Sequence, residues 1–281
     1  MSSNPPAQHL SERITGAADA LRRQLGTVPP LLVVTGSGLG GFASRLENAV
    51  TVSYTELPHF PASAVVGHAG KLVKGALHGR EIVVMSGRKH LYEGVDAADA
   101  AIPLRALLKA GVRTVILSNA AGALNAKFDV GDLMLITDHI NNMFRNPLVG
   151  PNLDEFGGRF PDMSEPYSRA LQAAAREAAR EEGILLREGV YAGNLGPNYE
   201  TGAEVQFLRQ HADAAGMSTV TETLVARHAG ARVLGISLIS NTLVRSTGPV
   251  THDEVIEAGR EGADKFSRLV TRIVRKVDPS A

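Results

Sequence analysis

The segment from residue 31 to residue 41 constrains the fold of this chain more than any other. Leu31 to Val34 are apolar, two of them are β-branched, and a cluster of small residues from Gly36 to Gly41 follows. Such a run predicts a buried strand that ends in a tight turn. Ligands of open α/β sheets bind at the carboxyl ends of strands, and glycines let the backbone approach an anion closely. We therefore expect this turn to bind a phosphate group.

Segments of strand character and helix character alternate along the rest of the chain. Strands are expected over residues 51–57, 71–77, 80–86, 114–118, 132–138, 188–193 and 232–240. Helices are expected over residues 11–25, 97–110, 168–182, 203–211, 222–229 and 252–276. The small residues from Asn119 to Gly122 indicate a turn. The alternation predicts one α/β domain with a central sheet over residues 10–281, after a disordered lead at residues 1–9.

The composition argues against several classes of function. The 29 basic residues balance the 29 acidic ones, so nucleic acid and anionic membranes are not expected partners. The absence of cysteine excludes disulfides, thiolate metal sites and a cysteine nucleophile, and it fits a cytosolic protein. No apolar run approaches the ~20 residues of a membrane span. No histidine spacing indicates a metal site, and Ser37 lacks the G-x-S-x-G pattern of serine hydrolases.

The same glycine cluster formally matches the dinucleotide-binding pattern. Gly36, Gly38 and Gly41 have the G-x-G-x-x-G spacing, and Glu56 provides an acidic residue near the end of the next expected strand. The intervening helix, however, can have only a handful of residues, which is too short for a βαβ crossover. An oxidoreductase with a Rossmann fold remains an alternative, as does a glycine turn without a ligand.

Arg88, His90 and Tyr92 alternate along one polar segment. If this segment is extended, all three side chains face the same way. The guanidinium and the imidazole suit a phosphate, because arginine forms paired hydrogen bonds to anionic oxygens, while the tyrosine suits a sugar. The alternative is a solvated basic loop.

Three further polar residues each have a functional and a structural interpretation. His68 lies between glycines and is, by itself, typical of a structural or surface histidine. Glu200 follows Tyr199 at a strand end, where it could accept from the N–H edge of a heterocycle or stabilise a helix N-terminus. Asn241 ends an almost wholly apolar strand, so it either binds a partner or caps that strand.

Taken together, these pieces form an ordered set of motifs. They are Gly36-Ser37-Gly38-Leu39-Gly40, Gly67-His68-Ala69-Gly70, Gly87-Arg88-Lys89-His90-Leu91-Tyr92-Glu93-Gly94, Asn119-Ala120-Ala121-Gly122, Gly196-Pro197-Asn198-Tyr199-Glu200-Thr201, Gly216-Met217-Ser218-Thr219 and Ser240-Asn241. With them the chain resembles the trimeric, low-molecular-mass purine nucleoside phosphorylases over residues 10–275, nearly its whole length.

The resemblance implies a fold and a reaction. The fold is a single α/β domain around a central, mixed and distorted β-sheet flanked by helices. In the reaction, inorganic phosphate attacks the anomeric carbon of a purine nucleoside and gives free base and (deoxy)ribose 1-phosphate, a step of purine salvage. Phosphate is a co-substrate, no cofactor or metal is required, and the assembly is a cytoplasmic homotrimer.

The resemblance also implies the site residues. The phosphate-binding set is Ser37, His68, Arg88, His90, the backbone N–H of Ala120, and Ser218. The ribose-binding set is Tyr92, Met217 and His252, and the base-binding set is Tyr199, Glu200 and Asn241. The residues expected to take part in catalysis are Asn241, Glu200 and His90. Phe156, in the long polar segment from 141 to 163, matches the position that reaches into the neighbouring subunit's site.

Two positions bear on the substrate. Related methylthioadenosine phosphorylases have an acidic residue where this chain has Asn241, and an apolar residue where it has His252. Both differences favour 6-oxopurine nucleosides with a free 5′-hydroxyl, namely inosine, guanosine and their deoxy forms. A 5′-methylthioadenosine-type phosphorylase and a nucleoside-binding module without catalysis remain as alternatives.

Overall fold

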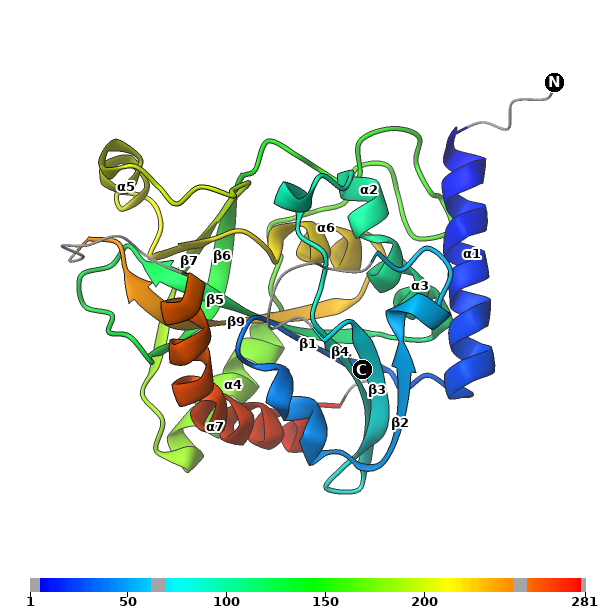
Figure 1. Cartoon of the computed structure of the whole chain (residues 1–281), viewed down its shortest axis with the longest axis horizontal. Coiled ribbons are helices and arrows are strands. Elements are labelled where there is room, and N and C mark those ends of the chain that lie inside the picture. The colour runs from blue at the N-terminus through cyan, green and yellow to red at the C-terminus, as the bar shows by residue number, and fades with distance from the viewer. Residues whose placement is uncertain (1–5, 62–68, 245–251, 279–281) are drawn as a thin grey trace.

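A computed structural model describes residues 6–61, 69–244 and 252–278 of the chain (Figure 1). The strands of the described part are β1 (Leu31–Thr35), β2 (Glu47–Ser53), β3 (Lys71–Leu77), β4 (Arg80–Ser86), β5 (Thr114–Ala123), β6 (Leu133–Asn142), β7 (Leu186–Asn194), β8 (Ala214–Gly216) and β9 (Arg232–Thr242). They form one sheet in the order β2-β3-β4-β1-β5-β8-β7-β6-β9.

The α-helices are α1 (Pro6–Leu25), α2 (Ala97–Ala100), α3 (Ile102–Ala110), α4 (Arg169–Glu182), α5 (Gly202–Leu208), α6 (Val220–His228) and α7 (His252–Lys276). Short 3₁₀ helices are η1 (Gly40–Arg45), η2 (Tyr54–Glu56) and η3 (Leu91–Glu93). Among the described residues, no helix is both long and apolar enough to cross a bilayer.

The sheet is mixed and strongly distorted, as the resemblance implies. Parallel pairs join β1 to β4 and β5, β5 to β9, and β7 to β6 and β8. Antiparallel pairs join β2 to β3, β3 to β4, β5 to β8 and β6 to β9. Because β5 pairs with both β8 and β9, the strands β5, β8, β7, β6 and β9 close into a ring, and β1, β4, β3 and β2 extend from it.

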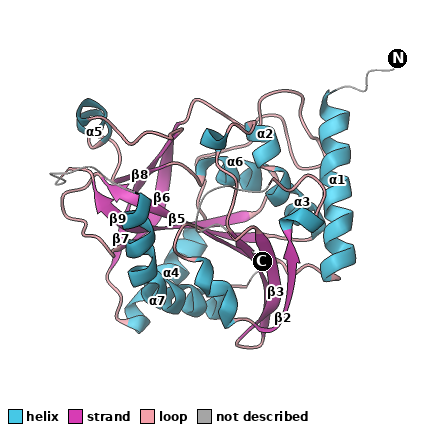
Figure 2. Cartoon of the chain, in the orientation of Figure 1, coloured by secondary structure: helices cyan, strands magenta, loops and turns pink. Residues whose placement is uncertain are grey.

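Helices cover both faces of the sheet (Figure 2). On one face, α1, α3 and α6 pack on a core that includes Leu32 and Val34. On the other face, α4 and α7 pack on a core that includes Leu31 and Val33. Successive side chains of a strand point to opposite faces, so the continuous apolar run of β1 supplies both cores. The structure therefore confirms the expected buried strand at residues 31–34.

Some expected elements have different limits. Residues 119–122 do not form a turn, because β5 continues through them to Ala123 and pairs there with β9 and β8. The expected strand at 51–57 is wrong in its second half, where η2 replaces it. The expected helix at 97–110 is interrupted at Ala101, one residue before Ile102 and Pro103 open α3.

The N-terminal helix is also longer than expected. It begins at Pro6 rather than near residue 11, so residues 6–9 are helical and not part of a disordered lead. Proline is favourable in the first turn of a helix, where its missing N–H has no partner to lose. Residues 1–5 lie outside the described part of the chain.

The turn after β1 does not belong to a dinucleotide-binding fold. It leads through η1 into β2, which lies at the far edge of the sheet and pairs antiparallel with β3. A Rossmann unit would instead place the next strand parallel to β1 and beside it. Glu56 accepts a hydrogen bond from the backbone N–H of Ser53 at 2.8 Å and thus caps η2. The geometry therefore excludes the Rossmann alternative.

Gly38 has a packing role in this turn. Its φ is +76°, and a Cβ built there would lie 2.5 Å from the Cα of Gly259 in α7. The sequence predicts that Gly38 lets the backbone close on an anion. The structure shows that its missing side chain lets α7 approach the turn.

Gly38 therefore meets two requirements, a positive φ and the absence of a Cβ next to α7, and substitutions can separate them. Gly38→Ala should lower the free energy of unfolding by about 2–4 kcal/mol, because it adds a clash to an unfavourable φ. Gly26→Ala is the matched control: φ is +66° there, but no atom of the described residues lies within 4 Å of the added Cβ. That control should cost only about 1 kcal/mol. Urea unfolding measures both, and equal losses would contradict the packing role.

Candidate active site

One cavity lies where the ends of several strands meet. Most of the expected site residues line it, namely Ser37, Arg88, His90, Tyr92, Ala120, Tyr199, Glu200, Met217, Ser218 and Asn241. They follow or end β1, β4, β7, β8 and β9, except Ala120, which lies within β5. The fold thus brings together residues as far apart in the sequence as Ser37 and Asn241.

Three expected site residues are not part of this set. His68 lies outside the described residues. So does the side chain of His252, although α7 begins at that position and Val255, one turn later, lines the cavity. Phe156 does not line the cavity of its own chain; it packs against the core, with the Arg105 guanidinium 5.7 Å from its ring centre.

The antiparallel strand β8 brings Ser218 next to β5. Ala215 of β8 pairs with Gly122 of β5, so the turn that follows β8 returns along β5 toward Asn119. The amide Nδ2 of Asn119 donates to the Thr219 hydroxyl at 2.8 Å and holds this turn. Thr219 has a φ of +73°, which is rare for a β-branched residue and marks a conformation imposed by its surroundings.

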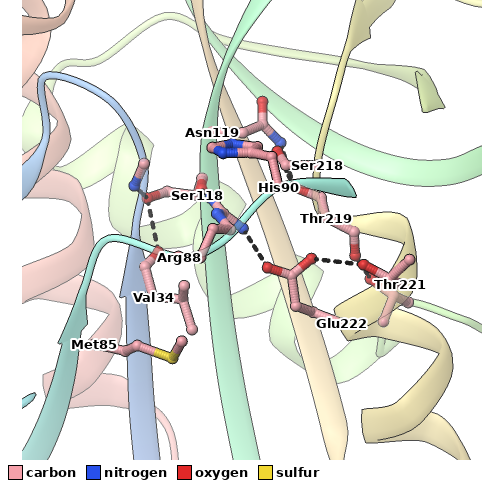
Figure 3. A network of polar contacts seen from close by, with 12 residues as sticks. Val34, Met85, Arg88, His90, Ser118, Asn119, Ser218, Thr219, Thr221 and Glu222 are labelled. Carbon is pink, nitrogen blue, oxygen red and sulfur yellow. Dashed lines mark hydrogen bonds and ion pairs between the residues drawn. The ribbon is translucent and has the colours of Figure 1, made fainter. Parts of the chain in front are cut away.

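Arg88 is almost fully buried and is held by two acceptors (Figure 3). Its Nη1 donates to Oε1 of Glu222 in α6 at 2.9 Å, and its Nη2 donates to the backbone oxygen of Ser118. Burial raises the pKa of the Glu222 carboxyl, but the Arg88 guanidinium more than offsets this, and the pKa lies below its usual range. The two residues therefore form a buried ion pair at the wall of the cavity.

Gly36 allows the first turn to approach this pair. A Cβ at Gly36 would lie 2.9 Å from the Cα of Asn119 and 3.3 Å from Nη2 of Arg88. The Ser118 hydroxyl donates to the backbone oxygen of Val34 at 2.9 Å and accepts from the Gly36 N–H at 3.3 Å. These contacts fix the turn after β1 against β5 and place Ser37 at the cavity wall.

His90 is uncharged near neutral pH. Burial and, to a smaller extent, the Arg88 charge lower its pKa to about 4, and Glu222 and Glu93 oppose this change only partly. The contact of 3.6 Å between Nδ1 of His90 and Oε1 of Glu93 is therefore not an ion pair at pH 7. The imidazole stacks on the ring of Tyr92, with centroids 4.8 Å apart and an interplanar angle of 13°. Both rings thus face the cavity as neutral groups.

A β-bulge in β9 sets the direction of the Asn241 side chain. In the pairing of β5 with β9, Ala121 lies opposite Ile239 and Gly122 lies opposite Asn241, so Ser240 is an extra residue. Such a bulge redirects the side chains that follow it. The Ser240 hydroxyl donates to Oδ1 of Asn241 at 2.9 Å, while Nδ2 is buried and has no hydrogen-bond partner among the described residues. A buried donor normally has a partner, so Nδ2 is available to a ligand or an ordered water in the cavity.

Glu200 provides an acceptor in the same cavity. It follows Tyr199, whose side chain is 37% exposed, and its Oε1 accepts from Nδ2 of Asn194 at 2.5 Å. The cavity thus combines a cationic group and hydroxyls with a separate amide donor and carboxylate acceptor. The first set suits an oxyanion, and the second suits the edge of a heterocycle that carries both donors and acceptors.

Sequence reasoning missed the residues behind these groups, above all Glu222, Ser118, Asn194 and Ser240. Glu222 carried one available signal, because it is an acidic residue in the first turn of a helix that directly follows the Gly216–Thr219 turn. The other three are small polar residues at strand ends or within strands, and nothing in their local sequence indicates their partners.

Comparisons with known proteins agree with this geometry. Residues 30–275 match the model of the phosphorylase superfamily. The chain is 49% identical over 266 residues to purine nucleoside phosphorylase 1 of Geobacillus stearothermophilus, covering 94% of this chain and 97% of that relative. The structure is similar to that of a Schistosoma purine nucleoside phosphorylase in complex with hypoxanthine, with a TM-score of 0.90, 38% identity, and coverage of 95% of this chain and 98% of the other.

A second solved structure gives the same result. It is isoform 2 of purine nucleoside phosphorylase from Schistosoma mansoni, in complex with cytosine and ribose-1-phosphate. The TM-score is again 0.90, the identity is 39%, and the match covers 95% of this chain and 97% of the other. The similarity therefore extends over nearly the whole fold in both comparisons.

The buried ion pair predicts how stability depends on pH. Glu222→Gln should lower the free energy of unfolding by about 2–4 kcal/mol at pH 7, because Arg88 loses its charged partner. The pKa of Glu222 is lower in the folded state, so the pair stabilises above the unfolded value near 4.5 and this contribution is lost as the pH falls through the folded value. The difference between parent and variant should therefore narrow in acid.

Urea unfolding between about pH 7 and pH 3 measures this difference. The matched control is Glu188→Gln, which breaks a 2.7 Å pair with Arg176 in which both side chains are more than 40% exposed. It should cost less than about 1 kcal/mol. A Glu222 variant that is no less stable than this control would contradict the role of the buried pair.

Proposed function

The chain belongs to the purine nucleoside phosphorylases of the phosphorylase superfamily, and we propose that within this family it acts on 6-oxopurine nucleosides. Purine nucleoside phosphorolysis is the reaction, and inosine, guanosine and their deoxy forms are the proposed substrates. The products are the free purine and (deoxy)ribose 1-phosphate, as purine salvage requires. One observation carries the proposal: Arg88 and Ser218 share a single cavity with Glu200 and Asn241.

The anion-binding part of the cavity is the proposed phosphate site. Arg88 supplies the charge, and Ser37, Ser218, His90 and the backbone N–H of Ala120 supply uncharged donors, with His68 as a further expected donor. Glu222 holds the Arg88 guanidinium in place, since its Oε1 lies 2.9 Å from Nη1. A neutral His90, whose pKa of about 4 lies well below its usual value, can donate to phosphate without adding a second positive charge.

Catalysis follows from where charge develops. A phosphate oxygen attacks C1′ while the bond from C1′ to N9 breaks, and the electron pair of that bond moves onto the purine. The sugar resembles an oxocarbenium ion in the transition state, so the phosphate dianion also serves as its counter-charge. The purine takes up a proton from solvent at N7. Fixed hydrogen bonds aimed at the developing charge lower this barrier.

Asn241 and Glu200 are the proposed base contacts, and Tyr199 is proposed to pack on the ring. Nδ2 of Asn241, which has no hydrogen-bond partner in the described part of the chain, can donate to O6, and Oδ1 can accept from the protonated N7. Glu200 can accept from N1–H, a hydrogen that 6-oxopurines carry and adenine lacks. Tyr92, Met217 and His252 are proposed to hold the ribose, with His252 facing the 5′-hydroxyl.

The proposal also covers the oligomeric state of the enzyme and its need for cofactors. We expect a cytoplasmic homotrimer in which Phe156 reaches the neighbouring subunit's site. We also expect the reaction to need no cofactor or metal, with inorganic phosphate as co-substrate. The 5′-methylthioadenosine-type phosphorylase remains the second candidate, and a substrate comparison separates the two.

The direct test is cleavage of inosine. Incubation with inosine and phosphate should release hypoxanthine, and release should cease when phosphate is omitted, because phosphate is the nucleophile. High-performance liquid chromatography measures the base and the sugar phosphate. Parallel incubations with adenosine and 5′-methylthioadenosine should give much lower kcat/KM values. Absence of phosphate-dependent release of hypoxanthine would refute the proposal.

The base contact of Asn241 gives a specificity prediction. In Asn241→Asp, a carboxylate replaces the amide, so the donor to O6 is lost and an acceptor for a 6-amino group is gained. The ratio of kcat/KM for adenosine to that for inosine should rise by at least about tenfold, the effect of one well-placed hydrogen bond. If this variant still acts only on inosine, the role of Asn241 in choosing the base is wrong.

A further inference from the structure

Glu200 lies between two cavities. One is the active-site cavity, and the second is lined by Glu200 together with Asn142, Phe144, Asn194 and Phe207. Phe144 and Phe207 are 81% and 63% exposed, so the second cavity opens to solvent. A carboxylate at this position can therefore point into the active-site cavity or into the solvent-exposed second cavity. A contact within the protein must favour one of these two orientations.

A chain of two hydrogen bonds, from Asn142 to Asn194 and from Asn194 to Glu200, holds the carboxylate. Nδ2 of Asn194 donates to Oε1 of Glu200 at 2.5 Å, and Nδ2 of Asn142 donates to Oδ1 of Asn194 at 2.7 Å. Because Oδ1 of Asn194 is occupied by a donor, its Nδ2 is the atom left to face the carboxylate. A carboxylate only accepts, so this orientation of the amide is the one that attracts Glu200.

The two asparagines lie on rigid elements, whereas Glu200 lies in a loop. Asn142 and Asn194 are the last residues of β6 and β7 and are directly paired in the parallel register. Asn194 is only 9% exposed. Between Asn194 and the start of α5 the chain forms no regular element, so the strand end is the nearest fixed point for the Glu200 side chain.

The backbone next to Glu200 is held from the other side. Thr201 caps α5: its hydroxyl accepts from the Glu204 N–H at 3.3 Å, and its own N–H donates to Oε2 of Glu204 at 2.7 Å. This capping box restrains the main chain but not the direction of the Glu200 side chain. The amide of Asn194 is therefore the contact that orients the carboxylate.

We propose that Asn194 is a positioning residue for base recognition, whose amide, oriented by Asn142, keeps the Glu200 carboxylate facing the active-site cavity. The inference rests on the proposed function, in which Glu200 accepts from N1–H of the base. Oε1 is held by Asn194, and Oε2 is left to meet the substrate. Asn194 itself does not line the active-site cavity.

The test is a double-mutant cycle on inosine. Asn194→Val removes the amide and keeps a side chain suited to a strand, and it should lower kcat/KM for inosine about tenfold with the KM for phosphate unchanged. Glu200→Ala should lower kcat/KM about 10- to 150-fold. In the Glu200→Ala background, Asn194→Val should have almost no further effect, because its role acts through that carboxylate.

A matched control and a pH profile separate positioning from general damage. Asn198→Val alters another asparagine that lines the second cavity, and its amide Nδ2 donates to the backbone oxygen of Tyr199 rather than to a side chain. The kcat/KM of this variant should change less than about twofold. Asn194→Asp sets two carboxyls side by side, which then share one proton. Its kcat/KM relative to the parent should recover as the pH is lowered from about 8 to about 5, because a protonated carboxyl restores the donor.

The outcomes are distinct. Losses that add in the cycle, or an Asn194→Asp variant with no acid recovery, would overturn the role of Asn194 while leaving the proposed function intact. A parent that does not cleave inosine with phosphate would overturn the proposed function and this inference together. Non-additive losses with an unchanged KM for phosphate and with acid recovery support the positioning role.

Discussion

The closure of the sheet through β5 is the constraint on which the rest of the structure depends. This strand pairs with β9 along its length and with β8 at its end. Three backbones therefore converge at residues 119–123, and only small side chains fit there. A Cβ at Gly122 would lie 2.9 Å from Leu243, and one at Gly216 would lie 2.6 Å from the Tyr191 hydroxyl. The cavity exists because this crowded junction carries almost no side-chain volume.

The charges in the site are already balanced in the structure without a substrate. The Arg88 charge is balanced by Glu222, and His90 stays neutral because burial and Arg88 lower its pKa to about 4. An oxyanion that binds there would accept hydrogen bonds from donors that are already oriented, in a site without a large net positive charge. Because these polar groups are preorganised, they need not reorient during the reaction, and this is usually the largest contribution of polar groups to catalysis.

In the proposed base-binding part, the side chains that line the cavity are likewise held by neighbouring groups, but these partners are uncharged. Asn241 is oriented by the Ser240 hydroxyl at the bulge in β9, and Glu200 is oriented by Asn194 at the end of β7. In both cases a polar residue on a strand holds the side chain that faces the cavity. Under the proposed function, substrate recognition would therefore depend on strand ends as much as on the loops that carry the proposed contact residues.

The sequence by itself determined most of the local elements and predicted most of the residues that line the cavity. The apolar run of β1, the hairpin of β3 and β4, and α4 between its Ser168 cap and Gly183 all follow from signals within a few residues. Only the tertiary structure decided that β5 extends through Ala123, that β8 turns Ser218 back toward Ala120, and that Glu222 meets Arg88. Those features arise from pairing between segments more than 90 residues apart, whose partners local periodicity cannot specify.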